Sequence, residues 1–360
     1  MDAQSHESAE QPGLVVAIDA MGGDRAPEVV IDGTLAALAS EPRLVALLVG
    51  PASRLQGLLD ARGASAGPRL RLLDAPATIG MAEHPVEALR RKPHSSIAQA
   101  VQALAAGQAR AVFSAGNTGA LAVAANTALG RLPGVRRPGI AVVLQGQRGP
   151  VVLIDAGANL QPRPADLAAY AVLASAYARA MLGIEHPAVG LLNIGSEESK
   201  GSALLQQAAA LVRGIAGIAF AGFVEGHELL AGRVNVVVAD AFTGNAVLKV
   251  SEGLALAVLE GVAEVLRAEF AAAGPEQHRR LEAALARLWR RYDYAEYGGA
   301  PLLGVAGIVV IGHGRSSARA VASGLRVALR AAELELDRRL VAALAQDLQA
   351  AGTDGQTDGS

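Results

Sequence analysis

The sequence predicts an α/β protein with a doubly wound, mostly parallel, Rossmann-like sheet and helices on both faces. Short β-branched runs such as Val236–Val238 are typical of strands buried on both faces. Such runs are followed by turns rich in Gly, Asn or Ser and then by segments with helical periodicity. Ile140–Leu144 and Val151–Ile154 predict a β-hairpin, and an apolar-to-basic stretch at about 254–295 predicts a protruding helical segment.

Composition and charge restrict the class of protein. The chain has 360 residues, of which 51% are hydrophobic and only 3% aromatic, so we expect a core of Ala, Val, Leu and Ile. A net charge of −2 argues against a general nucleic-acid binder. The lack of cysteine excludes disulfides, thiolate nucleophiles and cysteine-based metal sites.

The chain is predicted to form one domain with polar ends. We place a single α/β domain at residues 14–335 and loose tails at 1–13 and 350–360. The first residues lack the basic start and apolar run of a signal peptide. No apolar run reaches the ~18 residues needed to span a bilayer. We therefore expect a cytoplasmic protein.

The first half of the chain predicts a βαβ series. Strands are expected at Leu14–Ile18, Leu44–Val49, Leu70–Leu73 and Ala111–Ser114. Glycines in the turns let the backbone approach a ligand, and acids and amides supply polar contacts, although Asn and Gly also form ordinary turns. The candidate binding residues after these strands and after the hairpin are Asp19, Gly22, Gly23, Asn117, Thr118, Gly119, Asp155 and Asn159.

The second half repeats the pattern. Strands are expected at Val189–Ile194, Ile215–Val224 and Ile308–Ile311, and His313 follows the last of them. Lys200 is placed early in a helix, where a positive charge opposes the helix dipole unless an anion compensates for it. This position makes Lys200 a candidate ligand for an anion.

The stretch from Val234 to Gly253 organises the rest of the chain. Asp240 follows its short strand, residues 243–245 are predicted to form a turn, and a helix is expected from Asn245 onward, with Lys249 near its start. Ligands of open α/β sheets collect beyond the carboxyl ends of strands, where helix N-termini attract anions. An acid, an amide and an amine at such an edge therefore indicate a site, with Gly244 allowing close approach.

Familiar nucleotide and metal motifs are absent or incomplete. Gly312–Ser317 partly matches the dinucleotide pattern GxGxxG but lacks its third glycine. The chain has no GxxxxGK[ST] phosphate loop and no HExxH, and its seven histidines are scattered. Turns rich in Gly, Asn, Ser and Thr with single basic residues suit a small anion and a polarised carbonyl. The residues alone thus predict a phosphate-handling α/β enzyme without a thiol intermediate.

Six motifs occur together in one order. They are IDAMGGDRAP at 18–27, SAGNTGA at 114–120, IDAGAN at 154–159, NIGSEESKG at 193–201, VVVADAFTGNAVLK at 236–249 and YGGAPLLG at 297–304. Their combination resembles the bacterial PlsX family, the acyl-carrier-protein:phosphate acyltransferases of phospholipid synthesis. The resemblance covers about residues 14–330.

The resemblance implies transfer of a long-chain acyl group from acyl carrier protein to inorganic phosphate, which gives acyl phosphate for phosphatidic acid synthesis. It implies no metal and no cofactor. The expected catalytic residues are Lys200, Asp240 and Asn245. Lys200 and the Asn117 turn would hold phosphate, donors near Asn245 would stabilise the oxyanion, and Asp240 would orient Lys200 or a phosphate proton.

The resemblance also implies partners. We expect a homodimer, loose contact with the cytoplasmic face of the membrane, and a downstream acyl-phosphate:glycerol-3-phosphate acyltransferase. The segment 254–289 pairs an apolar stripe with arginines, as interfacial helices do, and dimer packing would explain it equally well. Three alternatives remain: a phosphotransacetylase-like enzyme that uses acyl-coenzyme A, a nicotinamide-dependent dehydrogenase, and a non-catalytic membrane scaffold.

Overall fold

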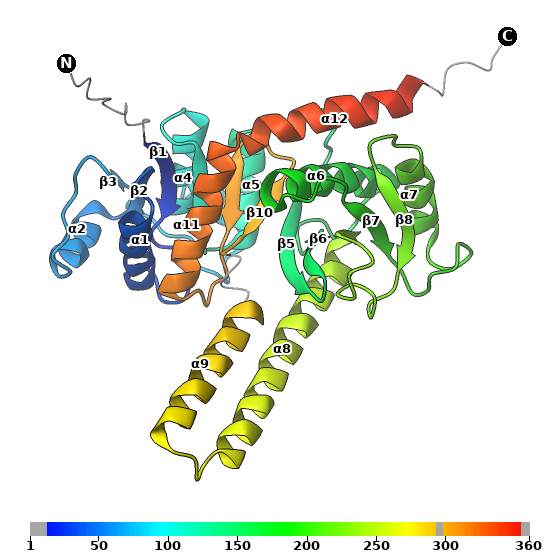
Figure 1. Ribbon diagram of the computed structural model, residues 1–360. Helices are drawn as coiled ribbons and strands as arrows, with labels where there is room; N and C mark the ends of the chain where they lie inside the picture. The colour runs from blue at the N-terminus through cyan, green and yellow to red at the C-terminus, as the bar shows by residue number, and fades with distance from the viewer. Residues whose placement is uncertain (1–12, 293–297, 354–360) are drawn as a thin grey trace, which may run out of the picture.

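The computed structural model describes residues 13–292 and 298–353 (Figure 1). The predicted tails fall outside these ranges, except for residue 13 and residues 350–353, the last of which end a helix. The strands are β1 (Leu14–Asp19), β2 (Leu44–Gly50), β3 (Leu70–Asp74), β4 (Ala111–Ser114), β5 (Gly139–Gly146), β6 (Gly149–Ile154), β7 (Ala188–Leu192), β8 (Ala219–Val224), β9 (Val236–Val238), β10 (Ala300–Leu303) and β11 (Ile308–Ile311).

Helices connect most of these strands. Their bounds are α1 (Glu28–Ser40), α2 (Ala52–Asp60), α3 (Pro85–Arg91), α4 (Ser96–Ala105), α5 (Thr118–Ala128), α6 (Pro164–Leu182), α7 (Ala203–Arg213), α8 (Ala241–Glu269), α9 (Pro275–Tyr292), α11 (Ala318–Glu333) and α12 (Leu336–Thr353). The predicted α/β class is therefore confirmed, and so is the hairpin, which is formed by β5 and β6.

One mixed sheet runs through the molecule, in the order β3-β2-β1-β4-β11-β10-β5-β6-β9-β7-β8. The first five of these strands are parallel to one another, and so are the last four. Three antiparallel pairings, β11–β10, β10–β5 and β5–β6, connect the two sets. Three reversals leave the sets, called here the N-terminal block and the central block, running in opposite directions.

The register brings the carboxyl ends of the two blocks together. Ile311, at the end of β11, pairs with Ala300 at the start of β10. Two residues farther along β10, Leu302 pairs with Ile140 of β5. The next residue of β5, Ala141, pairs with Ile154, the last residue of β6. The blocks thus overlap only across the short β10 and the start of β5. Their strand-end loops meet at the middle of the sheet, although the strands point in opposite directions.

Helices cover both faces of the sheet, and the strands alternate accordingly. Val16 and Ile18 of β1 pack in one hydrophobic cluster, which includes residues of α1, α6, α11 and α12. Ala17, between them, packs in the other cluster with residues of α4 and α5. This alternation follows from the two-residue period of a strand.

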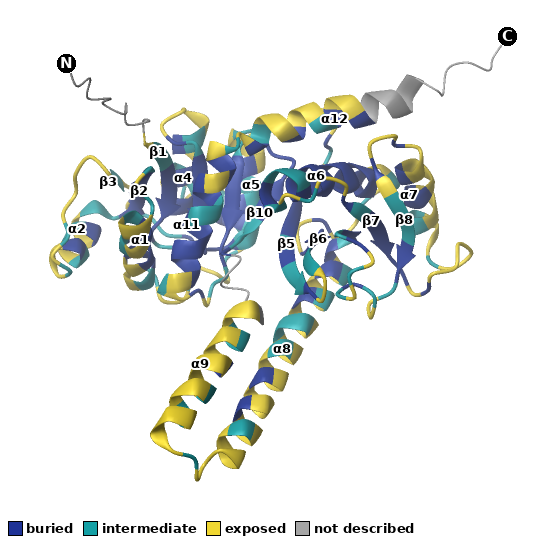
Figure 2. Cartoon of the chain, in the orientation of Figure 1, coloured by how far each residue is buried: buried dark blue, intermediate teal, exposed yellow. Residues whose placement is uncertain are grey.

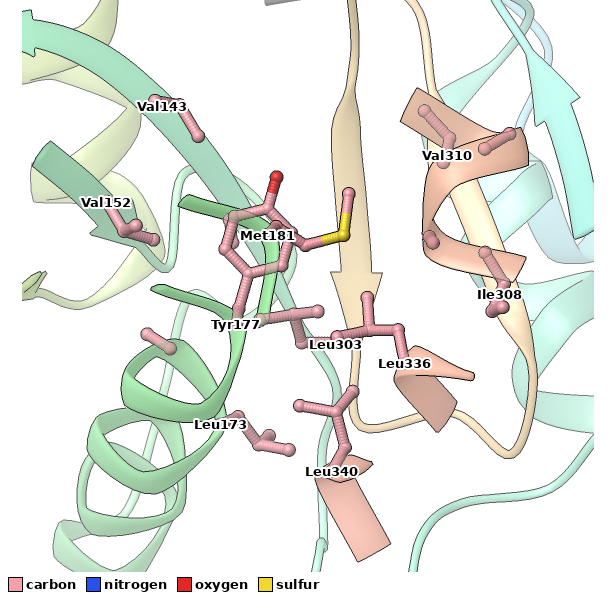
Figure 3. Close-up of a cluster of buried hydrophobic side chains, with 14 of the residues drawn as sticks. Val143, Val152, Leu173, Tyr177, Met181, Leu303, Ile308, Val310, Leu336 and Leu340 are labelled. Carbon is pink, nitrogen blue, oxygen red and sulfur yellow. The ribbon is translucent and has the colours of Figure 1, made fainter. Parts of the chain in front are cut away.

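The fold continues beyond residue 335, where the sequence analysis ended the domain. Helix α12 places Leu336, Leu340 and Leu344 in the same buried cluster as Leu173 and Tyr177 of α6 (Figure 3). Only about one residue in four of α12 is buried in this contact, and most of the others are polar or exposed. The sequence of α12 therefore does not show the wide apolar stripe that predicts a core helix.

Helices α8 and α9 project together from the body of the molecule (Figure 1). Both are mostly exposed along their length (Figure 2). Leu259, Ala263 and Leu285 are buried, and Arg267 pairs bidentately with Glu282 at 2.8 and 3.0 Å across the two helices. No helix in the described residues is long and apolar enough to cross a membrane.

Several local predictions differ from the structure. Strand β8 begins at Ala219, four residues later than the predicted start at Ile215. Residues 243–245 belong to the first turns of α8, which begins at Ala241, because Asp240 caps the helix earlier than the apolar pattern suggests. Strand β7 ends at Leu192, and Ile194 is 81% exposed in the following loop. Strand β10 was not predicted, since four residues that include Pro301 carry little strand signal. The first residue of the YGGAPLLG motif lies outside the described residues.

Candidate active site

A cavity of about 460 Å³ lies where the strand-end loops of the two blocks meet. The N-terminal block contributes residues after β1, β4 and β11, and the central block contributes residues after β6 and from α8. Among the predicted site residues, Thr118, Asn245 and His313 line this cavity. The polar or charged residues beside them are Asp24, Lys249, Glu252, Arg315 and Ser316.

The start of α8 carries Asn245 to the cavity. The carboxylate of Asp240 caps this helix: its Oδ1 accepts the Thr243 N–H at 3.0 Å and its Oδ2 accepts the Thr243 hydroxyl at 2.6 Å. Gly244 is required here, since a Cβ would lie 2.0 Å from the Asp155 carbonyl oxygen. Asp240 and Gly244 do not line the cavity, and they fix the helix that presents Asn245.

Asp155 holds together the loop after β6. Its Oδ1 accepts the N–H groups of Ile140, Gly157 and Ala158 at 2.9–3.0 Å, and its Oδ2 accepts that of Asn159 at 2.7 Å. The side chain is fully buried, and burial raises the pKa of its carboxyl against the opposing effect of these four hydrogen bonds. Asp155 thus shapes the cavity wall at Ile140 and Gly157.

Asn159 continues the same internal network. Its side-chain amide lies 3.4 Å from the Tyr170 hydroxyl, and its carbonyl accepts the Ala241 N–H. The side chain is only 4% exposed. Asn159 therefore connects the β6 loop to α6 and to the start of α8.

Asp19 has the equivalent position in the N-terminal block. The Ser114 hydroxyl donates to Asp19 Oδ2 at 2.6 Å and in turn accepts the Gly116 N–H at 3.0 Å. Burial raises the pKa of the Asp19 carboxyl, while the Ser114 hydrogen bond lowers it. A Cβ on Gly22 would lie 2.6 Å from both Asp19 Oδ2 and the Gly116 nitrogen, so glycine permits this contact between turns.

The turn before α5 is also held internally. Asn117 caps the helix through Oδ1, and its amide donates to the carbonyls of Gly80, Met81 and Glu83 at 3.0–3.2 Å. A Cβ on Gly119 would lie 2.6 Å from Pro85, so this glycine lets α5 approach α3 closely. Thr118, between them, lines the cavity.

Gly23 connects this loop region to the last strand-end turn. Its φ of +114° suits glycine, and the next residue, Asp24, donates its N–H to the Gly314 carbonyl at 2.8 Å. Asp24 and Gly314 both line the cavity. The turns after β1 and β11 are therefore joined at its rim.

His313 and Lys249 bring one titratable side chain from each block into the cavity. Lys249 Nζ lies 3.2 Å from His313 Nε2 and 3.2 Å from Glu252 Oε2. His313 Nδ1 accepts the Arg315 N–H at 3.1 Å. Burial, and then the nearby Lys249 charge, lower the pKa of His313. The ring is therefore mainly neutral at pH 7.

Lys200 does not line the cavity. It lies in the loop before α7, and its Nζ pairs with Glu197 Oε1 at 2.7 Å. This carboxylate raises the pKa of Lys200. The prediction that Lys200 lies early in a helix is wrong, because α7 begins only at Ala203. The loop with Lys200 follows β7, and β9 lies between β7 and β6 in the sheet. Lys200 is therefore two strands away from the loop after β6, which lines the cavity.

The arrangement suits an anion beside an apolar surface. Helices α5 and α11 begin at the cavity, and Lys249 and Arg315 add positive charge. The sequence pattern indicated Lys249 but no role for it, and it did not indicate Arg315, Glu252 or Asp24 as site residues. Lys249 lies two turns into α8, so only the helix bounds could place it at the rim. No group of three or more potential metal-binding side chains gathers in the described part of the chain.

Comparison with known proteins defines the class of enzyme. The chain is 45% identical over 336 residues to the phosphate acyltransferase of Desulforamulus reducens, covering 93% of this chain and 98% of that protein. It is also 45% identical over 324 residues to the phosphate acyltransferase of Pelotomaculum thermopropionicum, covering 90% and 93%. A phosphotransacetylase from Streptococcus pyogenes shares the fold, with a TM-score of 0.63 at 17% identity over 89% of this chain and 94% of that one.

These relatives make the chain an acyltransferase, and this decides against the dehydrogenase and the scaffold. The family follows from its sequence model. Residues 14–339 match the model described as Fatty acid synthesis protein, and the chain belongs to that family. The resemblance to the PlsX family is thereby confirmed.

Proposed function

We propose that this enzyme transfers a long-chain acyl group from the thioester of acyl carrier protein to inorganic phosphate. The observation that carries the proposal is the cavity between the blocks. It combines two cationic side chains, Lys249 and Arg315, with two helix N-termini and an apolar wall. This combination suits a phosphate beside an acyl thioester. The absence of cysteine fits direct attack by phosphate on the thioester carbonyl.

In this mechanism a phosphate oxygen forms a bond to the thioester carbonyl carbon, and the carbon–sulfur bond then breaks. The electron pair leaves with sulfur, which takes up a proton and becomes the free thiol of the carrier. We assign Asn245 to the oxyanion, because it lines the cavity and the capped start of α8 fixes its backbone there. Asn245→Ala should lower kcat by about 10²–10³-fold, as loss of one oxyanion donor does elsewhere.

The first experiment measures release of free carrier-protein thiol from palmitoyl-acyl carrier protein, with and without phosphate. A palmitoyl-coenzyme A arm tests the alternative donor. Release that requires phosphate and yields acyl phosphate would support the proposal, and the ratio of the arms would identify the donor. Phosphate-independent release, or none in either arm from folded enzyme, would refute it.

Two lysines compete for the role of phosphate ligand. Lys200 is proposed as catalytic from its motif, with Asp240 as its orienting partner, whereas Lys249 lies at the cavity itself. Lys200→Ala should raise the phosphate KM sharply if the motif identifies the ligand. Lys249→Ala is the matched variant. An unchanged phosphate KM in Lys200→Ala together with a raised one in Lys249→Ala would move the role to Lys249.

The partners belong to the same proposal. Arg279 and Arg280 on the exposed face of α9 suit an acidic carrier protein. The exposed apolar side chains of α8 suit a second copy of the chain or the cytoplasmic membrane surface. The acyl phosphate would pass to an acyl-phosphate:glycerol-3-phosphate acyltransferase. We accordingly propose a homodimer in the cytoplasm with loose membrane contact.

A further inference from the structure

A second cavity, of about 360 Å³, adjoins the first. It lies between the β5–β6 hairpin, α8 and α9, and its wall is largely apolar, with Leu144, Leu230, Leu256, Leu259 and Trp289. Leu259 is 8% exposed, although most of the projecting part of α8 is exposed. The two helices thus enclose an apolar space beside the base of the projection.

The two cavities share one wall. Both are lined by Val143, Lys249, Glu252, His313 and Arg315. Along α8, the first cavity starts at Asn245 and the second extends to Leu259. At 1.5 Å per residue, these 14 positions span about 21 Å. The path therefore starts at a charged rim and ends at an apolar wall about 21 Å away.

We propose that this second cavity holds the acyl chain, with the methyl end toward Trp289, and that its depth sets the longest acyl group accepted. This inference rests on the proposed function and assigns one substrate group to one place. An acetyl group would need none of this space, whereas a long chain would bury its methylenes there at about 0.8 kcal/mol each. The ion pair between Lys249 and Glu252, which lies between the two cavities, would keep the thioester carbonyl beside Asn245.

Two glycines of α8 provide a matched test. Gly253 lines the second cavity and Gly261 does not, and a Cβ built at either position meets no heavy atom within 4 Å. A leucine at either position would gain similar helix propensity, so both variants should fold. Only Gly253→Leu fills the proposed path.

The expected result is a change in chain-length preference. Gly253→Leu should lower kcat/KM for palmitoyl donors at least about tenfold, which corresponds to ~1.4 kcal/mol, and leave octanoyl donors within about twofold. The phosphate KM should not change, and Gly261→Leu should behave as the parent enzyme. Equal losses for both donors, or an unchanged palmitoyl rate in Gly253→Leu, would overturn the proposal.

A binding measurement separates this inference from the proposed function. Trp289 is the only tryptophan in the chain, so indole fluorescence reports directly on this cavity. 16-Bromohexadecanoic acid should quench it more strongly than 2-bromohexadecanoic acid, and Gly253→Leu should abolish the difference. Equal quenching by both probes would place the chain elsewhere, even if acyl transfer occurs. Stronger quenching by the 16-bromo acid without any acyl transfer would refute the proposed function but support the second cavity as the site of the acyl chain.

Discussion

Helices α6 and α8 are both rich in Ala, Leu and Val, yet the fold surrounds one and exposes the other. Fourteen of the 19 residues of α6 are buried beneath the sheet and α12, against five of the 29 residues of α8. Along α8, side chains such as Leu254 and Val265 are more than 60% exposed. Figure 2 shows most of the projecting part of this helix in the colour of exposed residues. Apolar composition therefore does not distinguish a helix covered by its own chain from one available to a partner.

A matched pair of leucines tests this difference most strongly. Leu173→Ala in α6 should lower the free energy of unfolding by about 2–5 kcal/mol, because Leu173 is fully buried. Leu254→Ala in α8 should change it by less than about 0.5 kcal/mol, because that side chain is 61% exposed. Urea unfolding at low protein concentration measures both. Comparable losses would show that the α8 face is covered in solution.

Substitutions at the start of α8 and in its projecting part should have opposite effects on stability. Gly244→Ala should destabilise the protein by about 1–3 kcal/mol, because its Cβ would collide with the Asp155 carbonyl oxygen. Gly261 lies in the projecting part of α8, and a Cβ there meets no heavy atom within 4 Å. Gly261→Ala should therefore stabilise the protein by up to about 1 kcal/mol through helix propensity. Thermal unfolding of the two variants is the measurement. A tolerated Gly244→Ala would mean that α8 is not anchored at the loop after β6.

A charge on the exposed face probes whether a second copy covers α8. Val265 is 68% exposed in the single chain. Val265→Glu should weaken self-association by about tenfold or more, since burying an unpaired charge costs more than ~1.4 kcal/mol. Sedimentation velocity over a concentration series detects the shift. A parent enzyme that stays monomeric throughout would contradict the proposed homodimer.

The smallest effect is expected from His313. Its folded-state pKa is lowered by burial and Lys249, so the unfolded chain binds more protons between that value and the ordinary pKa of about 6.5. The resulting stability is complete above pH 6.5 and is lost as the pH falls through this window. His313→Gln should flatten the difference in unfolding free energy between pH 7 and pH 5. A steeper slope in the variant would reverse the assigned sign.

Most strands were predictable, because short β-branched runs bounded by turn residues are typical of buried strands. The structural roles of Asp19, Asn117 and Asp155 were not predictable. A polar residue at a strand end can bind a ligand or form hydrogen bonds within its own turn. In the structure Asn117 and Asp155 bond to backbone groups of their own and neighbouring loops. Asp19 accepts the Met21 N–H and the Ser114 hydroxyl. Lys249 and Arg315 meet at the cavity only because the two blocks oppose each other through β10, which the sequence did not indicate.

The strand order also has a consequence for synthesis on the ribosome. Strand β4 ends at Ser114, but its neighbour β11 begins only at Ile308. At the usual 5–20 residues per second, β4 waits about 10–40 s for that partner. During this interval the nascent N-terminal block has an open edge, which is a template for wrong pairing. Productive folding of this chain is therefore completed late, when its last strands emerge.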